Sequence, residues 1–312
     1  MAGSVREIAR KSGFSVAAVS KTLNSADGTI RIGEEARRKI LEAARELHYL
    51  PNNNLGLLVT PDYSYLDPLT ARVLQGVQLE AQTRQSQVLC GLLQGSDVPQ
   101  LVRESCVGGV LFLHSAPAAS TELLTERGIP YVVINPDTER PHDCVICDDH
   151  EGMTAALNFL REKRCKRLAW IWNENPHPSY IKRRKAFEEF VARRKLEHVH
   201  ITRRPDADVA RQIAALLKNP EPIGFVIFEE MLPLLLNMIG EVGRKLGETV
   251  HVVTVNDLLS ALFVPPVTSV RVPFLEMGRE AARMVFNKWD AGHKKIPSVI
   301  IKPVLIQRDP NL

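Results

Sequence analysis

The residues best placed for chemistry lie in a short polar run near the N-terminus, residues 15–24. The pattern predicts a serine-capped helix here, preceded by another helix and a glycine-containing turn. Two short helices joined in this way form a helix-turn-helix, which places its second helix in the major groove of DNA. We expect six of its residues to face bases or phosphates: Ser15, Val16, Ala17, Ser20, Lys21 and Asn24. The two apolar ones can contact a thymine methyl group but offer no hydrogen bonds to bases.

Local signals explain how such a helix pair would form. Ser4 and Glu7 fit a capping box at the start of the first helix, and Gly13 suits the left-handed conformation that ends it. A third helix is expected over residues 34–48, before a proline that ends it. Residues 1–54 hold nine Lys and Arg against six Asp and Glu, a net +3 of the chain's +4. This excess indicates either an anionic partner such as nucleic acid or a solvated basic face.

From residue 55 onward, short apolar runs alternate with longer amphipathic stretches. Strands are expected at 55–59, 107–113, 131–134, 168–172, 223–228 and 250–255. Helices are expected near 69–85, 119–127, 150–163, 181–195, 207–218, 231–246 and 275–290. This alternation predicts an α/β fold of doubly wound parallel sheets. We expect about ten strands in all, which is more than one such unit holds and therefore indicates two lobes.

Ligands of open parallel sheets bind beyond the carboxyl ends of the strands, so polar residues there are candidate ligands. The expected strand ends carry Asp62, Tyr63, His114, Glu229, Glu230 and Asn256. Arg183 opens an expected helix, and its guanidinium can hold a carboxylate or vicinal hydroxyls. Phe274 would supply an apolar wall. These eight residues predict a cleft for a small-molecule effector between the lobes, whereas Asp148 and Glu151 are expected to cap the helix at 150–163.

Missing signals argue against several classes of protein. No apolar run approaches the roughly 18 residues of a membrane span, and no signal-peptide pattern begins the chain, so we expect a cytoplasmic protein. No glycine-rich nucleotide fingerprint follows the strand at 55–59, which argues against an enzyme of the dinucleotide-binding kind. The five cysteines are expected to be buried thiols. We expect no metal or cofactor, although Cys144 and Cys147 form a lone C-x-x-C.

The N-terminal region resembles the lactose-repressor (LacI/GalR) family of transcriptional regulators through I-A-R-K-S-G-F-S-V-A-A-V-S-K-T-L-N and E-E-A-R-R-K-I-L-E-A-A-R-E-L-H-Y-L-P-N. The remaining chain is similar to the family's periplasmic-binding-protein-like domain, notably through R-R-K-A-F at 183–187 and P-P-V-T-S-V at 265–270. The resemblance implies a homodimeric repressor on a pseudo-palindromic operator of double-stranded DNA, with a carbohydrate-like effector. It also implies that Val16, Ala17 and Lys21 set specificity and that Asn52 contacts DNA.

The sequence departs from the family's pattern in two places. Members usually carry a hinge helix after Y-x-P-N, but here only a linker at 51–54 follows, which reaches roughly 13 Å. We therefore expect a helix-turn-helix domain at 1–50 and an effector-binding and dimerisation domain at 55–312, without a leucine wedged into the minor groove. Glu229-Glu230 stand where sugar-binding members carry Asn-Asp, and Asn256 stands where they carry Asp. These changes alter which hydroxyls or amines an effector can offer.

Two alternatives to an effector-controlled regulator stay open. One is a module that only binds a solute, and the other is a regulator that no longer responds to an effector. The helix expected around 69–81 is apolar on more than one face. One face would cover the sheet and the other would meet a second subunit, unless both are covered within one chain.

Overall fold

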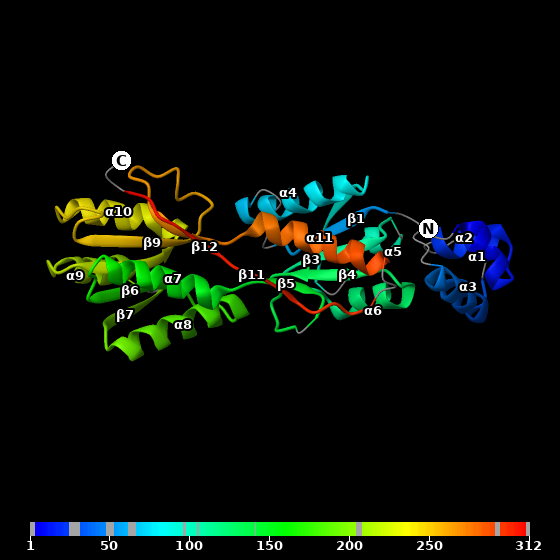
Figure 1. Ribbon diagram of the computed structural model, residues 1–312, viewed down its shortest axis with the longest axis horizontal. Helices are drawn as coiled ribbons and strands as arrows, with labels where there is room; N and C mark the ends of the chain where they lie inside the picture. The colour runs from blue at the N-terminus through cyan, green and yellow to red at the C-terminus, as the bar shows by residue number, and fades with distance from the viewer. Residues whose placement is uncertain are drawn as a thin grey trace. The chain divides into compact units, whose positions relative to one another are not determined.

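The computed structural model describes residues 4–24, 32–47, 53–61, 67–95, 98–104, 106–140, 142–203, 208–290 and 294–309. The chain forms two compact units, of which the first holds Met1–Ile146 with Phe274–Ile300 and the second Cys147–Pro273 with Ile301–Leu312. The chain therefore passes from one unit to the other three times (Figure 1). The sequence pattern predicted two lobes but not this exchange of segments.

The N-terminal helices share a small core of their own. They are α1 (Val5–Ser12), α2 (Val16–Asn24) and α3 (Glu34–Glu46). The predicted capping box is confirmed: Ser4 N–H donates to Glu7 Oε2 at 2.7 Å, and Glu7 N–H donates to Ser4 Oγ at 3.3 Å. Gly13 ends α1 with a φ of 78°. The buried residues between the three helices are Ile8, Ala9, Val19, Leu23, Ile40, Ala43 and Ala44.

The first sheet has the strand order β11-β5-β4-β3-β1-β2. Its strands are β1 (Leu55–Val59), β2 (Val88–Leu92), β3 (Gly109–Leu113), β4 (Tyr131–Ile134), β5 (Cys144–Cys147) and β11 (Val299–Ile301). β1 to β5 pair in parallel, as the alternating pattern predicted. The helices of this unit are α4 (Pro68–Thr83), α5 (Gln100–Arg103), α6 (Ala118–Arg127) and α11 (Phe274–Asp290).

Two glycines let α4 and α11 touch backbone to backbone (Figure 1). A Cβ on Gly76 would lie 1.9 Å from the carbonyl oxygen of Leu275. A Cβ on Gly278 would lie 2.2 Å from that of Val73. Because real Cβ atoms do not approach this closely, any larger residue would force the helices apart.

The second sheet has the order β12-β10-β9-β8-β6-β7. Its strands are β6 (Arg167–Asn173), β7 (Glu197–Arg203), β8 (Ile223–Phe228), β9 (Val250–Asn256), β10 (Thr268–Arg271) and β12 (Val304–Ile306), of which only β12 is shown to pair antiparallel. Its helices are α7 (Asp149–Glu162), α8 (Pro178–Arg194), α9 (Val209–Leu217) and α10 (Leu232–Glu241), with a short 3-10 turn η1 (Glu229–Met231).

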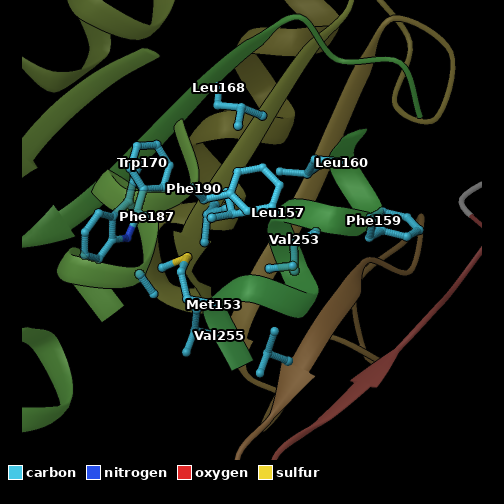
Figure 2. Packing of buried hydrophobic residues seen from close by; sticks show 14 of the residues in the cluster. Met153, Leu157, Phe159, Leu160, Leu168, Trp170, Phe187, Phe190, Val253 and Val255 are labelled. Atoms are coloured by element: carbon cyan, nitrogen blue, oxygen red, sulfur yellow. The ribbon is translucent and has the colours of Figure 1, made fainter. Parts of the chain in front are cut away.

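Successive side chains of β6 point to opposite faces of the second sheet, and each face is covered by a buried layer. Trp170 and Trp172 pack with α7 and α8, and Figure 2 shows Trp170 beside Phe187 in that layer. Ala169 and Ile171 face the other way and pack with α9 and α10. β6 is buried on both faces from Arg167 to Trp172, which is the arrangement that the apolar strand runs predicted.

The structure differs from the expected elements at several points. α10 ends at Glu241 rather than near residue 246, because Gly243 turns the chain with a φ of 67°. Twelve strands lie among the described residues, against about ten expected. β1 begins at Leu55 as expected, and Asn54 is already tied to the first sheet, since its carbonyl oxygen accepts from Gly108 N–H at 2.9 Å. Of the expected linker, residues 51 and 52 lie outside the described residues.

Candidate DNA-binding helix and effector site

The N-terminal half of α2 is fixed by a cap and left open on one side. Ser15 Oγ accepts from Ala18 N–H at 3.1 Å, which satisfies a free donor of the first turn. Val19 and Leu23 are buried against α1 and α3. On the other face Ser15, Val16 and Ala17 are exposed, and 49% of the surface of Val16 is accessible to solvent. Val16 and its two neighbours are therefore accessible to a partner of this helix.

Polar candidates of the same helix lie one turn further on. Ser20 and Lys21 are half-buried. The cations Lys11 and Lys39 pair with Glu46 and Glu35 at 2.6 and 3.0 Å, whereas within residues 4–24 and 32–47 no carboxylate pairs with Lys21. Its ammonium is therefore available to a phosphate. Asn24 is the last residue of α2, but its side chain, like the whole of Asn52, lies outside what the structure describes.

In the second unit, Arg183 forms a buried ion pair. Its Nη2 lies 2.6 Å from Asp149 Oδ1, and the two side chains are 9% and 3% exposed. Asp149 is the first residue of α7, whereas Asp148 caps that helix by accepting from Glu151 N–H at 3.0 Å, as predicted for Asp148. Thus α7 and α8 bring a guanidinium and a carboxylate together before any ligand is added.

Two aromatic rings flank this pair. The Arg183 guanidinium lies 5.9 Å from the ring centre of Tyr180 and 5.8 Å from that of Phe228, which are stacked on each other at 5.2 Å. Burial raises the pKa of Tyr180. Burial likewise raises the pKa of the nearby Cys147 thiol far above its usual range, so this cysteine stays protonated and unreactive.

Glu229 holds a turn together. Its carboxylate accepts from the backbone N–H groups of Leu258, Leu259 and Ser260 at 3.0, 2.9 and 2.7 Å, and also from the Ser260 hydroxyl. These bonds use both oxygens of the Glu229 carboxylate, and Glu229 is 6% exposed. Glu229 therefore serves the turn after β9, and it is not part of the site proposed below.

The other candidates of the second unit lie at the carboxyl ends of their strands, as expected. Glu230 follows β8 and pairs with Arg203 at 3.2 Å, both half-exposed. Asn256 is the last residue of β9 and has a φ of 93°. Its neighbour Asp257 binds Arg271 at 2.8 Å and Arg308 at 2.7 Å.

The first unit carries the remaining candidates. His114 follows β3 with a φ of 68°, is 6% exposed, and its Nδ1 lies 2.9 Å from the carbonyl oxygen of Asn135. Phe274 is the buried first residue of α11. Asp62 and Tyr63 lie outside the described residues.

Sequence reasoning missed Asp149 and the two rings. Asp148 and Asp149 stand side by side at a helix start, where one carboxylate is enough for the cap. The surplus aspartate was the available signal. Tyr180 lies three residues before Arg183 on the same helix, a spacing that places both side chains on one face.

Over the described ranges, no three His, Cys, Asp or Glu side chains are grouped so that they could hold a metal ion. In the same ranges, no helix is both long and apolar enough to cross a membrane.

Comparison with known proteins gives two family matches. The family described as "Bacterial regulatory proteins, lacI family" matches residues 4–52, and "Periplasmic binding protein-like domain" matches residues 157–309. Among curated proteins, the HTH-type transcriptional regulator RegA of Clostridium saccharobutylicum is 24% identical over 335 residues, covering 99% of both chains. The HTH-type transcriptional repressor CytR of Escherichia coli K12 is 23% identical over 319 residues, covering 94% of this chain and 91% of CytR.

Solved structures share the fold at low sequence identity. The lac repressor dimer bound to operator and the anti-inducer ONPF matches all of both chains with a TM-score of 0.66 and 16% identity. The complex of the transcriptional regulator CelR with cellobiose gives 0.64 and 21%, covering 98% of this chain and 99% of CelR. The relatives that match nearly the whole chain are named as regulators, and the two matched families follow one another along it. The chain is a member of the lacI family of bacterial regulatory proteins, which are DNA-binding transcriptional regulators.

Proposed function

We propose that this regulator is a dimeric repressor that reads operator DNA with α2 and changes its affinity when a small polyhydroxylated effector binds. The exposed start of α2 is the observation that carries the DNA contact, because Ser15, Val16 and Ala17 are held at its open face by a cap and a buried core. Repression is inferred from relatives named as repressors, such as CytR. Binding alone would perform this function, with no catalytic step, and its DNA target would place the protein in the cytoplasm.

The effector-binding residues are proposed separately for the two units. In the second unit they are the Arg183–Asp149 pair with Glu230 and Asn256, and in the first unit the candidates are Asp62, Tyr63, His114 and Phe274. A guanidinium beside a carboxylate can hold vicinal hydroxyls, since one donates and the other accepts. Structures of similar fold were solved with cellobiose and with ribose, which favours a carbohydrate-like effector here.

The domain boundaries belong to the same proposal: helix-turn-helix at 1–50, linker at 51–54, and effector-binding and dimerisation domain at 55–312. Residues 47–54 separate Glu46, the end of α3, from β1, and Asn54 at their end is already bonded to the first sheet. We infer that this short segment forms no hinge helix. Operator DNA should then bend little. A complex in which a leucine from residues 50–58 lies between base pairs would contradict this.

Dimerisation has two candidate surfaces. In the second unit, large apolar side chains are exposed on and after α10 and in the loop after β9: Leu234, Val242, Leu259, Leu262 and Val264. In the first unit, Leu79 of α4 is 42% exposed. Exposed apolar residues that gather in one region are typical of subunit contacts. Charged substitutions at Leu262 and Val264 should weaken the dimer if the first surface is used, as measured by sedimentation.

Replacement of Arg183 by lysine tests the effector site. Lysine keeps the charge beside Asp149 but lacks the planar fork, so the response of DNA binding to effector should weaken about tenfold or more. Arg184→Lys is the matched control, because Arg184 is exposed, pairs with Glu188 in the same helix and lies over the Trp172 ring, away from Asp149. The probes would be sugars, polyols and uronic acids, first screened by thermal shift. If none of these compounds stabilises the protein, a regulator that does not respond to an effector becomes the better account. Sequence-selective DNA binding would still show that the protein is a regulator and not a solute-binding module.

A further inference from the structure

A cavity lies at the edge of the second sheet where the strands begin, opposite the carboxyl ends that carry Glu230 and Asn256. Its volume is about 490 Å³, within the range of roughly 300–1,000 Å³ typical of small-molecule pockets. It lies at the end of α7, the loop before β9, the start of β10 and the segment after β12. Its lining residues are Phe159, Lys163, Leu246, Gly247, His251, Val252, Pro266, Val267, Thr268, Gln307, Arg308 and Asp309.

This cavity is separate from the proposed effector site, although α7 reaches both. Asp149 is the first residue of α7 and Lys163 directly follows its last. Fourteen residues of helix span about 21 Å, so the cavity lies a whole helix length from the Arg183–Asp149 pair. None of the residues assigned to the effector site lines it.

Two cations, Lys163 and Arg308, and one carboxylate, Asp309, line the cavity. Lys163 belongs to a basic turn. Residues 161–167 contain five Lys and Arg but one acidic residue. Lys163 is exposed and forms no ion pair among the described residues, and its ammonium lies 5.4 Å from the ring centre of Phe159. Arg308 is fixed by Asp257 at 2.7 Å and by the carbonyl oxygen of Val267 at 2.9 Å. Because Asp257 also pairs with Arg271, one carboxylate faces two guanidinium groups.

The remaining wall is apolar, with one buried imidazole. Phe159 points away from Trp170 and Phe187 in Figure 2, and it forms the apolar wall together with Leu246 and others. His251 is 6% exposed. Burial lowers the pKa of His251; a backbone hydrogen bond with Glu248 opposes this shift, and the nearby Lys163 adds to it. The ring is therefore neutral near pH 7, which leaves Lys163 as the cation of the cavity that no carboxylate pairs with among the described residues.

Cations that follow a helix stabilise its negative end, and that effect accounts for one or two of the basic residues near Lys163. It does not account for a cavity with an aromatic wall below the ammonium. We propose that the cavity binds a small organic anion with an apolar or aromatic body, its charge at Lys163 and its body against Phe159. The carbonyl end of α7 repels an anion, so binding should depend strongly on Lys163.

Fluorine NMR of the full-length protein tests the proposal with three probes: 4-fluorobenzoate, 4-fluorophenyl phosphate and the uncharged 4-fluorobenzyl alcohol. Line broadening is followed up to about 5 mM probe, a range that covers fragment affinities. Lys163→Gln removes the charge, Gln307→Glu adds an opposing one, and Lys166→Gln is the control. Lys166 is an exposed neighbour of the same basic turn that does not line the cavity. All three substitutions lie on exposed positions, so the protein should fold.

One or both anions should bind at least about tenfold more tightly than the alcohol. Lys163→Gln and Gln307→Glu should each weaken binding by about fivefold or more, and Lys166→Gln by less than about twofold. The better anion should also raise the melting temperature of the wild type more than that of Lys163→Gln. No binding of either anion, equal binding of the alcohol, or equal losses in Lys163→Gln and Lys166→Gln would each overturn the proposal.

Discussion

Replacing Arg183 with methionine should destabilise the second unit strongly. Methionine keeps much of the side-chain volume but leaves the Asp149 carboxylate, 3% exposed, without its partner at 2.6 Å. Breaking a buried ion pair from one side costs about 3–5 kcal/mol. Because Asp149 is the first residue of α7, the helix dipole stabilises its unpaired carboxylate and reduces this cost by about 0.3–1 kcal/mol. We therefore expect a loss of about 2–5 kcal/mol in the free energy of unfolding.

Urea unfolding followed by tryptophan fluorescence measures this loss. Trp170 and Trp172 belong to the second unit, whereas Trp289 belongs to the first and can be replaced by phenylalanine throughout. Arg184→Met is the control, because its exposed pair with Glu188 contributes about 0.3–0.5 kcal/mol and its contact with the Trp172 ring about 0.5–1 kcal/mol.

A double variant separates the ion pair from side-chain packing. Asp149→Asn added to Arg183→Met removes the stranded charge, so the double variant should be more stable than the sum of the single losses allows, by about 1–3 kcal/mol. If Arg183→Met costs no more than Arg184→Met, or if the two losses simply add, the buried pair is not what holds α7 to α8.

Three further predictions concern DNA, packing and pH. Lys21→Ala should weaken DNA binding similarly on all sequences and reduce the salt slope by about one, as measured by fluorescence anisotropy at several salt concentrations. Gly278→Ala should cost about 1–3 kcal/mol by calorimetry, since its Cβ would meet the Val73 carbonyl, whereas Gly240→Ala, with nothing within 4 Å, should be neutral or stabilising. Burial raises the pKa of Cys165 from 9.0 to about 12. The unfolded chain therefore loses that proton first, so its contribution to stability is complete below pH 9.0 and is lost as pH rises towards about 12. Cys165→Ala should flatten this alkaline decline, and a decline of unchanged size would contradict the assigned cause.

Local signals were sufficient for the N-terminal unit. The capping box at Ser4, the glycine at position 13 and the cap at Ser15 each act within four residues, and each is found in the structure. The parallel sheets also followed from the alternation of apolar runs, because buried strands are apolar on both faces. β7 was not predicted. It is an edge strand whose seven residues include Glu197, His198 and Arg203, so it contains no apolar run.

Partners distant in sequence could not be predicted. Arg183 was a candidate from its position alone, but its pairing with Asp149 depends on how α7 packs on α8. Glu229 sits at a strand end like the other candidates, yet its carboxylate is bound by a turn about thirty residues later. The exchange of α11 into the first unit depends on the contact of Gly278 with α4, which no sequence periodicity encodes.

Selection of bound duplexes from a random DNA pool tests the central claim most directly, since it asks whether α2 reads DNA. The full-length protein should enrich a two-fold symmetric site with half-sites about one helical turn apart, and a variant with charged residues at Val16 and Ala17 should enrich a different one or none. A pool that shows no enriched sequence, or the same site for both proteins, would contradict the account.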